Sequence, residues 1–312
     1  MNLILTTTCN KNCSFCFAKD KGNSKLTLEN IKEIVSKTPP NESIKLIGGE
    51  PTLHDEFGEI LDYLLTIPHP VLLISNFLIY KQHVKDAIIN FQKKKKMSFL
   101  LNVSEMTERQ YQVVINNINE IIDKNNLSLS LGFTLDDTRE WENDYKLMLE
   151  RFKKELDVKF IIRTSVPFPN YKEGEEKHFY LYHNYKLIDI LVDLIKWANR
   201  NDTKVSIDCG LFPCMMKDKE TKEFIKNWVQ DLNWGCTGGA FDVFATNYAS
   251  LCYPGKDINV DLSKHKTTET AFNELMLKKR THYNFDGLPV ECQQCEYLHK
   301  ECAGPCLGFV NI

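Results

Sequence analysis

Three cysteines stand close together near the amino terminus, and their spacing suits a metal centre. Cys9, Cys13 and Cys16 form a C-x3-C-x2-C run in the segment CNKNCSFC, with Phe15 just before the last cysteine. A closed zinc site needs four protein ligands, and so does a [4Fe–4S] cluster that is ligated only by protein. The next cysteine along the chain is Cys209. The run therefore predicts a four-iron cluster held by three cysteines, with one iron open to an external ligand.

This run resembles the C-x3-C-x-aromatic-C loop of the radical S-adenosylmethionine (SAM) superfamily at every position. The resemblance implies that the amino and carboxylate groups of SAM chelate the open iron. It also implies that reductive cleavage of SAM gives a 5′-deoxyadenosyl radical. Three cysteines in a surface loop, or half of a zinc site, are the alternatives.

A second motif follows the next predicted strand. Gly48, Gly49, Glu50 and Pro51 resemble the GGEP motif of the same family, one strand–helix unit after the cysteine loop. Two glycines let the backbone come close to a ligand, and Glu50 can accept hydrogen bonds from an ammonium group. The resemblance therefore predicts that all four residues bind SAM. A plain strand-to-helix turn is the alternative for this motif.

Polar residues end several later strands, where the family often has further contacts to SAM. The candidates for these contacts are Asn76, Asn102, Ser104 and Arg163. Phe77 replaces the glycine of the Thr-Asn-Gly turn found in many relatives, so we expect a different loop there. Arg163 would meet the SAM carboxylate or pair with an acid such as Asp136. Polar residues at strand ends also serve as helix caps, which is the simpler explanation for each.

Short apolar runs alternate with helical patterns over the first 200 residues or so. Strands are predicted at 3–7, 43–47, 71–75, 98–103, 128–134 and 158–165. Helices are predicted at 28–37, 57–65, 80–91, 107–124, 141–156 and 185–200, with Thr27 and Thr107 as caps. Strands joined by single helices form a parallel sheet with right-handed crossovers. The pattern predicts an α/β fold, a partial (β/α)6 TIM-like barrel as in the radical SAM family, with its chemistry at the carboxyl ends of the strands.

The remaining eight cysteines all lie in the last third of the chain, after a short strand predicted at 205–208. They are Cys209, Cys214, Cys236, Cys252, Cys292, Cys295, Cys302 and Cys306. Their spacing resembles the SPASM extension of radical SAM enzymes, which binds two auxiliary [4Fe–4S] clusters, and the segment between Cys236 and Cys252 reads as a hairpin. We therefore predict a radical SAM barrel over residues 1–204 and a small SPASM-like domain over residues 205–312. Paired zinc sites are the alternative, because four-cysteine zinc sites use similar spacings.

The chain departs from the SPASM pattern in three places. Asn247 stands where the family has glycine, and asparagine is the next residue best able to adopt a positive φ. The spacing between Cys295 and Cys302 is six residues rather than five, and the usual last cysteine is absent. The resemblance assigns Cys236, Cys252, Cys306 and one upstream cysteine to the first auxiliary cluster, and Cys292, Cys295 and Cys302 to the second. Either Cys209 or Cys214 completes the second cluster, or one of its irons is open to substrate.

Composition limits the partners and the compartment. The formal net charge of −3 gives no global case for a nucleic-acid partner. No uninterrupted apolar stretch approaches the ~20 residues that a bilayer requires, so no membrane partner is expected. The amino terminus lacks the features of a secretion signal. Eleven cysteines without such a signal favour the cytoplasm, where clustered thiols are more often metal ligands than disulfides.

A long irregular segment, residues 166–184, follows the sixth predicted strand. It carries five aromatic residues and two histidines, His178 and His183. Long loops of this kind are usually functional or disordered. We expect it either to line a substrate cavity at the mouth of the barrel or merely to pack on the barrel.

The resemblance implies an oxidoreductase-type radical SAM maturase that crosslinks or oxidises residues of a peptide or protein. The cofactors would be SAM and three [4Fe–4S] clusters, with an electron donor such as flavodoxin or ferredoxin. Because the barrel starts at Met1, a peptide would be recognised by a separate protein, by a strand edge or by the irregular segment. Dehydrogenation or rearrangement of a small molecule is the second hypothesis, and a non-catalytic iron–sulfur electron carrier is the third. No catalytic acid or base can be selected from the sequence.

Overall fold

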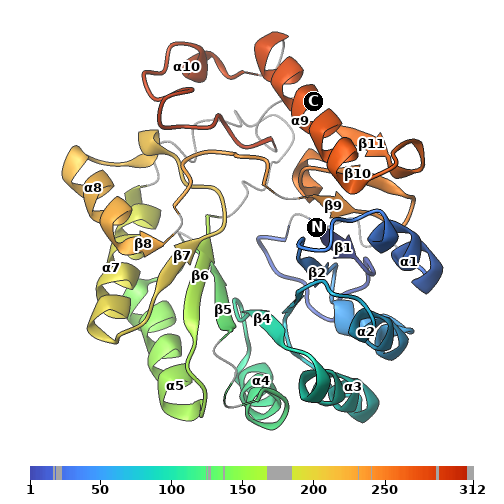
Figure 1. Cartoon of the computed structure of the whole chain (residues 1–312). Helices are drawn as coiled ribbons and strands as arrows, with labels where there is room; N and C mark the ends of the chain where they lie inside the picture. The colour runs from blue at the N-terminus through green and yellow to red at the C-terminus, as the bar shows by residue number, and fades with distance from the viewer. Residues whose placement is uncertain are drawn as a thin grey trace.

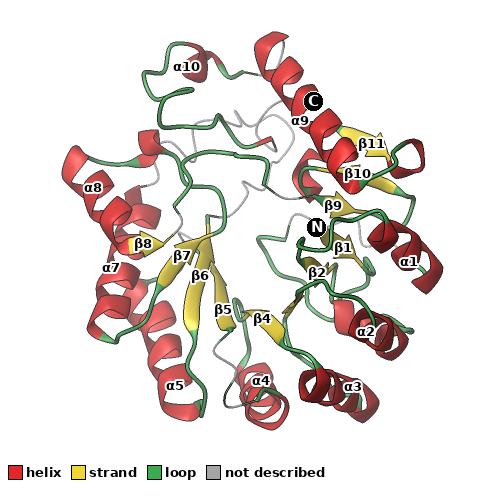
Figure 2. Cartoon of the chain, in the orientation of Figure 1, coloured by secondary structure: helices red, strands yellow, loops and turns green. Residues whose placement is uncertain are grey.

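The computed structural model describes residues 1–16, 18, 23–123, 125, 128–135, 138–166, 185–230, 232–239, 241–285 and 288–307. Within these residues the chain forms a strongly curved sheet with helices along its outer face (Figure 1). Figure 2 shows the strands on the inside and the helices on the outside of this curve. The arrangement confirms the predicted α/β partial barrel.

Eight strands run parallel and lie in the sheet in sequence order. They are β1 (Asn2–Ile4), β2 (Ile44–Ile47), β3 (Val71–Ser75), β4 (Met97–Asn102), β5 (Leu129–Thr134), β6 (Ile161–Ser165), β7 (Val205–Ile207) and β8 (Val229–Gln230). The alternating burial in β3 reflects one face against the barrel interior and one against the helices, whereas β5 is buried along its whole length. Parallel order brings the carboxyl ends of all these strands to one rim.

The sheet continues on the other side of β1. Strand β9 (Asp242–Val243) pairs with β1 in parallel, and β10 (Tyr248–Ser250) and β11 (Asn259–Asp261) add two antiparallel strands. The β9–β10 connection is the predicted hairpin, and Asn247 in it has φ of 60°, which confirms the expected left-handed conformation. A short asparagine side chain tolerates this conformation better than most residues do.

The outer helices follow the strands in alternation. They are α1 (Leu28–Ser36), α2 (Phe57–Leu65), α3 (Gln82–Lys94), α4 (Glu108–Ile121), α5 (Leu147–Glu155), α7 (Tyr185–Arg200) and α8 (Lys219–Trp228). Thr27 accepts a hydrogen bond from the Asn30 amide, and Thr107 forms a capping box with Gln110, so both predicted caps are confirmed. Two further helices, α9 (Thr268–Phe285) and α10 (Val290–Gln293), lie beyond the hairpin. No helix in the described part of the chain is both long enough and apolar enough to span a membrane.

Several boundaries differ from the sequence prediction. The predicted helix 141–156 is divided into a π-helical segment, Trp141–Lys146, and α5. Strand β6 begins at Ile161 rather than at residue 158. The short strand predicted at 205–208 is β7. The larger difference is the length of the sheet, because β7 joins it after β6, β8 continues it and β9 extends it beyond β1. The predicted division after residue 204 therefore falls inside a continuous sheet, and the two-domain description stays a prediction.

Candidate active site

The cysteine loop leaves β1 and runs directly beside the backbone that ends β2. The Gly49 amide donates to the Thr6 carbonyl over 2.7 Å, and the Glu50 amide donates to the Thr8 carbonyl over 2.8 Å. A Cβ atom on Gly48 would lie 2.3 Å from the Thr6 oxygen, and a Cβ atom on Gly49 would lie 2.3 Å from the Thr8 oxygen. Gly48 also has φ of +155°. Only glycine fits this approach, so the two glycines dock the cysteine loop against β2.

The side chain of Glu50 is fully buried and bridges the ends of β2 and β3. Its carboxylate accepts hydrogen bonds from the Thr52 amide (3.1 Å) and hydroxyl (2.7 Å), from the Ser75 hydroxyl (2.7 Å) and from the Asn76 amide (2.8 Å). Burial raises the pKa of this carboxyl, and the four hydrogen bonds oppose that shift. Pro51 begins the short 3-10 turn Pro51–Leu53 that follows. The predicted contact between Glu50 and SAM stays a prediction, and the geometry favours an indirect, positioning role.

The end of β3 contacts the cysteine loop through Asn76. Its side-chain amide nitrogen, Nδ2, donates to the side-chain oxygen of Asn10 over 2.8 Å and lies 3.9 Å from the Cys9 sulfur. Asn10 in turn donates to the Leu78 carbonyl over 3.1 Å. Phe77 adopts φ of 58°, so the turn keeps the left-handed backbone that a glycine would supply even though the side chain is large. The ring of Phe77 is fully buried and packs on the edge of Phe99, which offsets the backbone strain.

The loop after β4 holds the cysteine loop from the opposite side. The buried ammonium of Lys11 donates to the Ser104 carbonyl, and the Ser14 amide and hydroxyl both donate to the Glu105 carboxylate. Burial lowers the pKa of Lys11, whereas negative charges on Cys13, Glu105 and Cys9 raise it. The Cys13 thiol has its pKa raised by burial and lowered by the Lys11 charge. A buried cation therefore stands beside the thiols that would carry negative charge as metal ligands.

The other residues predicted to contact SAM lie at the same rim, where each binds another protein group. The Asn102 side chain accepts from the Ser104 amide over 3.2 Å, and the Ser104 hydroxyl accepts from the Thr134 amide over 2.8 Å. Arg163 forms an ion pair with Asp208 at the end of β7, and Asp136 lies outside the described residues. The Nε atom of Arg163 is buried and has no hydrogen-bond partner among the described residues. Residues 167–184, with His178 and His183, also lie outside the described residues.

The eight later cysteines fall into two neighbouring groups, which we call the first and second cysteine groups. In the first, Cys209, Cys236 and Cys252 influence one another electrostatically, and Cys306 lies with Cys236 and Cys252 near the Tyr283 hydroxyl. In the second, charges on Cys295, Cys302 and Cys292 all act on Cys214. Burial is the main cause that raises the pKa of Cys214 to about 12. Bound iron would favour the thiolate forms that burial disfavours.

Hydrogen bonds between short segments hold the two groups next to each other. The Cys236 amide donates to the Gly304 carbonyl over 2.9 Å, and the Ala303 amide donates to the Trp234 carbonyl over 3.0 Å. Between these segments, a Cβ atom on Gly235 would lie 2.7 Å from the Cys302 sulfur. Gly235 has φ of +80°, so glycine is favoured here both by the left-handed backbone conformation and by the lack of room for a Cβ atom. Among the described residues, no three His, Cys, Asp or Glu side chains form a group suited to a single metal ion.

Sequence reasoning missed the residues that fix the cysteine loop. Three of them, Lys11, Asn10 and Ser14, lie inside the cysteine loop. The fourth, Glu105, lies in the loop that follows β4 and accepts hydrogen bonds from Ser14. The available signal was weak, because Glu105 directly follows a polar strand end and Lys11 lies between two ligand candidates. Their roles depend on contacts between residues that are 66 to 93 positions apart, which spacing alone does not reveal.

The first part of the chain matches a known protein family. Residues 3–131 match the family model of the Radical SAM superfamily. This radical SAM match covers the cysteine loop, the GGEP motif and the strands β1 to β4, and it ends inside β5. The match and the shared fold together support radical SAM chemistry for this chain.

One curated relative and two solved structures show the range of similar proteins. The relative, an S-adenosylmethionine-dependent nucleotide dehydratase from Selenomonas ruminantium, is 33% identical over 79 residues, which are 24% of this chain and 29% of that protein. Streptococcus suis SuiB bound to S-adenosylmethionine superimposes with a TM-score of 0.68 at 14% identity, over 98% of this chain and 72% of SuiB. The protein anSMEcpe with bound AdoMet gives a TM-score of 0.66 at 16% identity, over 98% of this chain and 89% of that chain. SuiB has also been solved with its precursor peptide SuiA. At these identities the structural likeness shows the fold.

Proposed function

We propose that the chain is a radical SAM enzyme that modifies a peptide or protein. The observation that carries the proposal is the docking of the three-cysteine loop against the Gly48–Glu50 backbone at the carboxyl ends of β1 and β2. Cys9, Cys13 and Cys16 offer three thiols there, and the rim around them is lined by polar groups from β3, β4 and β6. Three thiols fit a cluster that leaves one iron for SAM.

The residues of this chain would bind and orient the reactants. When bound and reduced, a four-iron cluster supplies the electron that cleaves SAM to methionine and an adenosyl radical able to remove hydrogen from an unactivated carbon. The close backbone packing at Gly48 and Gly49 would hold the cysteine loop in place beside SAM. The unpaired Nε of Arg163 supports a contact with the SAM carboxylate. Asn76 would donate toward the Cys9 sulfur and hold it.

The two cysteine groups support two auxiliary [4Fe–4S] clusters. Each group contains four thiols, the number that a closed cluster requires. Auxiliary clusters would take an electron from the substrate radical or bind a substrate thiolate, and an electron donor such as flavodoxin or ferredoxin would reduce the SAM cluster. The resemblance of this region to SPASM domains favours a peptide or protein substrate.

A nucleotide or other small molecule is the second candidate substrate. The observation that favours it is the match of 33% identity to a nucleotide dehydratase, a similarity in sequence rather than in fold alone. The cations Lys11, Arg139 and Arg163 at or near the rim would suit an anionic ligand, although Arg163 is already paired with Asp208.

Mass spectrometry of reaction mixtures separates the two substrates. The anaerobically reconstituted and reduced protein would be incubated with SAM and either the small peptides encoded beside it or a set of nucleoside triphosphates. The proposal predicts a mass change in a peptide that depends on Cys13, with Cys13→Ala as the control. A Cys13-dependent product from a nucleotide, with every peptide unchanged, would replace the first candidate by the second.

A further inference from the structure

The loop after β7 carries two cysteines, Cys209 and Cys214, on either side of a buried segment. Gly210 has φ of +86°, and a Cβ atom on it would lie 2.9 Å from Val166, so the chain turns sharply just after Cys209. The following segment, Leu211 to Pro213, is buried, and Cys214 begins to emerge only after it. The Leu211 carbonyl accepts a hydrogen bond from the Gly235 amide over 2.9 Å, which fixes the segment against the C-terminal region. Cys209 and Cys214 therefore lie on either side of a buried segment that is hydrogen-bonded to the C-terminal region.

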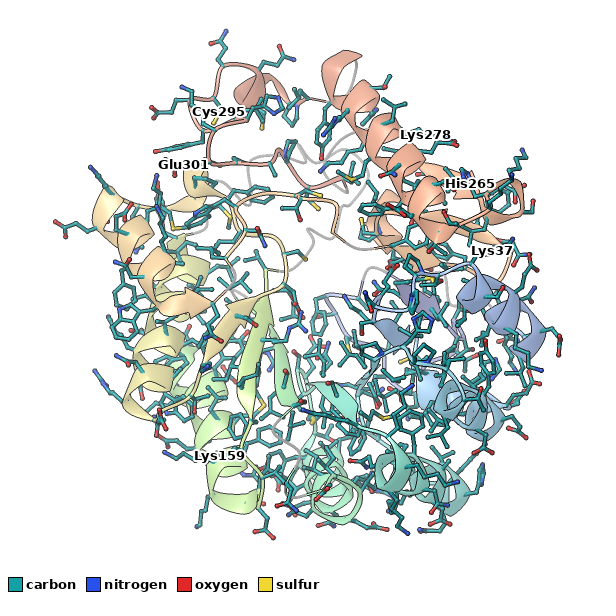
Figure 3. The ribbon with its side chains drawn as sticks, in the orientation of Figure 1. Lys37, Lys159, His265, Lys278, Cys295 and Glu301 are labelled. Carbon is teal, nitrogen blue, oxygen red and sulfur yellow. The ribbon has the colours of Figure 1, made fainter. Side chains whose placement is uncertain are left out.

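Helix α8 ties the chain beyond Cys214 to the loop that carries the second cysteine group. Asp218 caps α8 by accepting from the Thr221 amide over 2.7 Å. One turn later, the Lys222 ammonium lies 2.9 Å from the Glu301 carboxylate and 4.6 Å above the centre of the Tyr297 ring. Both partners lie between Cys295 and Cys302, and Figure 3 shows Glu301 beside the end of α8. The start of α8, which follows Cys214 in the chain, is therefore held beside the loop that carries Cys295 and Cys302.

Cys209 remains with the first cysteine group. Its carbonyl accepts from the Val166 amide at the end of β6 over 3.2 Å, which holds it at the barrel rim. On the other side of the first group, a Cβ atom on Gly255 would lie 3.3 Å from the Cys252 sulfur and 3.1 Å from Leu307, the residue after Cys306. Leu307, the residue after Cys306, thus lies beside the turn that follows Cys252.

We infer that Cys214 is the fourth protein ligand of the cluster held by Cys292, Cys295 and Cys302, and that Cys209 belongs to the other auxiliary cluster. This inference rests on the proposed function, because it requires two auxiliary clusters. All four irons of the second cluster are then ligated by protein, so this cluster transfers electrons and does not bind a substrate thiolate.

The test counts clusters in protein that lacks the SAM cluster. The full-length Cys13→Ala protein, reconstituted anaerobically, should hold about eight irons per chain in two clusters. Adding Cys295→Ala and Cys302→Ala should remove the second cluster and leave about four irons with a single electron paramagnetic resonance spectrum. Adding Cys214→Ala to that protein should leave the iron content and spectrum unchanged. Adding Cys209→Ala instead should alter the spectrum or release the remaining iron.

The reverse pattern, a spectrum altered by Cys214→Ala and unaffected by Cys209→Ala, would overturn the assignment. The Cys214→Ser variant provides a second reading, because an oxygen ligand should shift the spectrum of the second cluster alone while the circular dichroism stays that of the parent protein. Absence of all iron from the Cys13→Ala parent would instead contradict the auxiliary clusters of the proposed function.

Discussion

Replacing Gly49 by alanine tests whether the GGEP backbone sets the position of the cysteine loop. The new Cβ atom would lie 2.3 Å from the Thr8 oxygen and 2.6 Å from the Thr7 oxygen, whereas ordinary contact begins near 3.4 Å. Both atoms belong to the backbone, so the segment between β1 and Cys9 must move by about 1 Å. Misplacement of a reacting group by this amount costs about 100-fold in rate, and overpacking costs about 1–3 kcal/mol of stability.

The assay is the rate of 5′-deoxyadenosine formation by reduced, reconstituted protein, with thermal unfolding measured in parallel. Gly58→Ala is the matched control, because Gly58 lies in α2 and an added Cβ atom would meet nothing within 4 Å. We expect the control to cleave SAM at the parental rate and to be at least as stable, since alanine favours helix. If Gly49→Ala cleaved SAM as fast as Gly58→Ala, the docking argument would be wrong.

Three further predictions concern buried ionisable groups. Lys11→Met leaves the buried Ser104 carbonyl unpaired, so we expect about 1–3 kcal/mol lower stability and, because a nearby positive charge is lost, a more negative midpoint potential of the SAM cluster in a redox titration. Glu50→Gln cannot accept all four hydrogen bonds that the carboxylate accepts, so both the melting temperature and the affinity for SAM should fall. Burial raises the pKa of Asp242 to about 6 from 3.8. As the pH rises between these values, the unfolded chain releases a proton that the folded chain keeps, so stability falls by about 3 kcal/mol. Asp242→Asn should abolish this fall in urea unfolding measured from pH 4 to pH 7, and Asp62→Asn, on the exposed side of α2, should not.

Different results would contradict each argument. An unchanged potential in Lys11→Met would show that its charge does not act on the cluster. A parental melting temperature in Glu50→Gln would refute the bridging role of the carboxylate, and lower stability with unchanged SAM affinity would remove Glu50 from the binding site. A pH dependence that survives in Asp242→Asn would assign the effect to another group.

The local pattern of the sequence was sufficient for most of the barrel. Apolar runs and helical periodicity locate β3, α2 and α7 at their observed bounds, because each element buries one face against its neighbours. Thr27 and Thr107 cap their helices through contacts with residues three positions away, which sequence spacing contains. Local chemistry was also enough to predict the left-handed conformation of Asn247.

Long-range contacts could not be predicted in the same way. The pairing of β9 with β1 joins residues 240 positions apart, and two-residue strands such as β8 and β9 give almost no periodic signal. The ion pair between Arg163 and Asp208 depends on β6 and β7 being neighbours in register. For the same reason, spacing alone left the roles of Cys209 and Cys214 open, and the packing of α8 on the Cys295–Cys302 loop was needed to argue for one assignment.

The proposed chemistry requires that Cys9, Cys13 and Cys16 hold a cluster with an iron open to SAM. We would test this by electron paramagnetic resonance of the reduced protein with the auxiliary ligands Cys252 and Cys295 replaced by alanine, before and after addition of SAM. We expect a cluster signal that SAM shifts and that is absent when Cys13→Ala is added. A signal that SAM leaves unchanged, in protein shown to contain the full cluster, would contradict it.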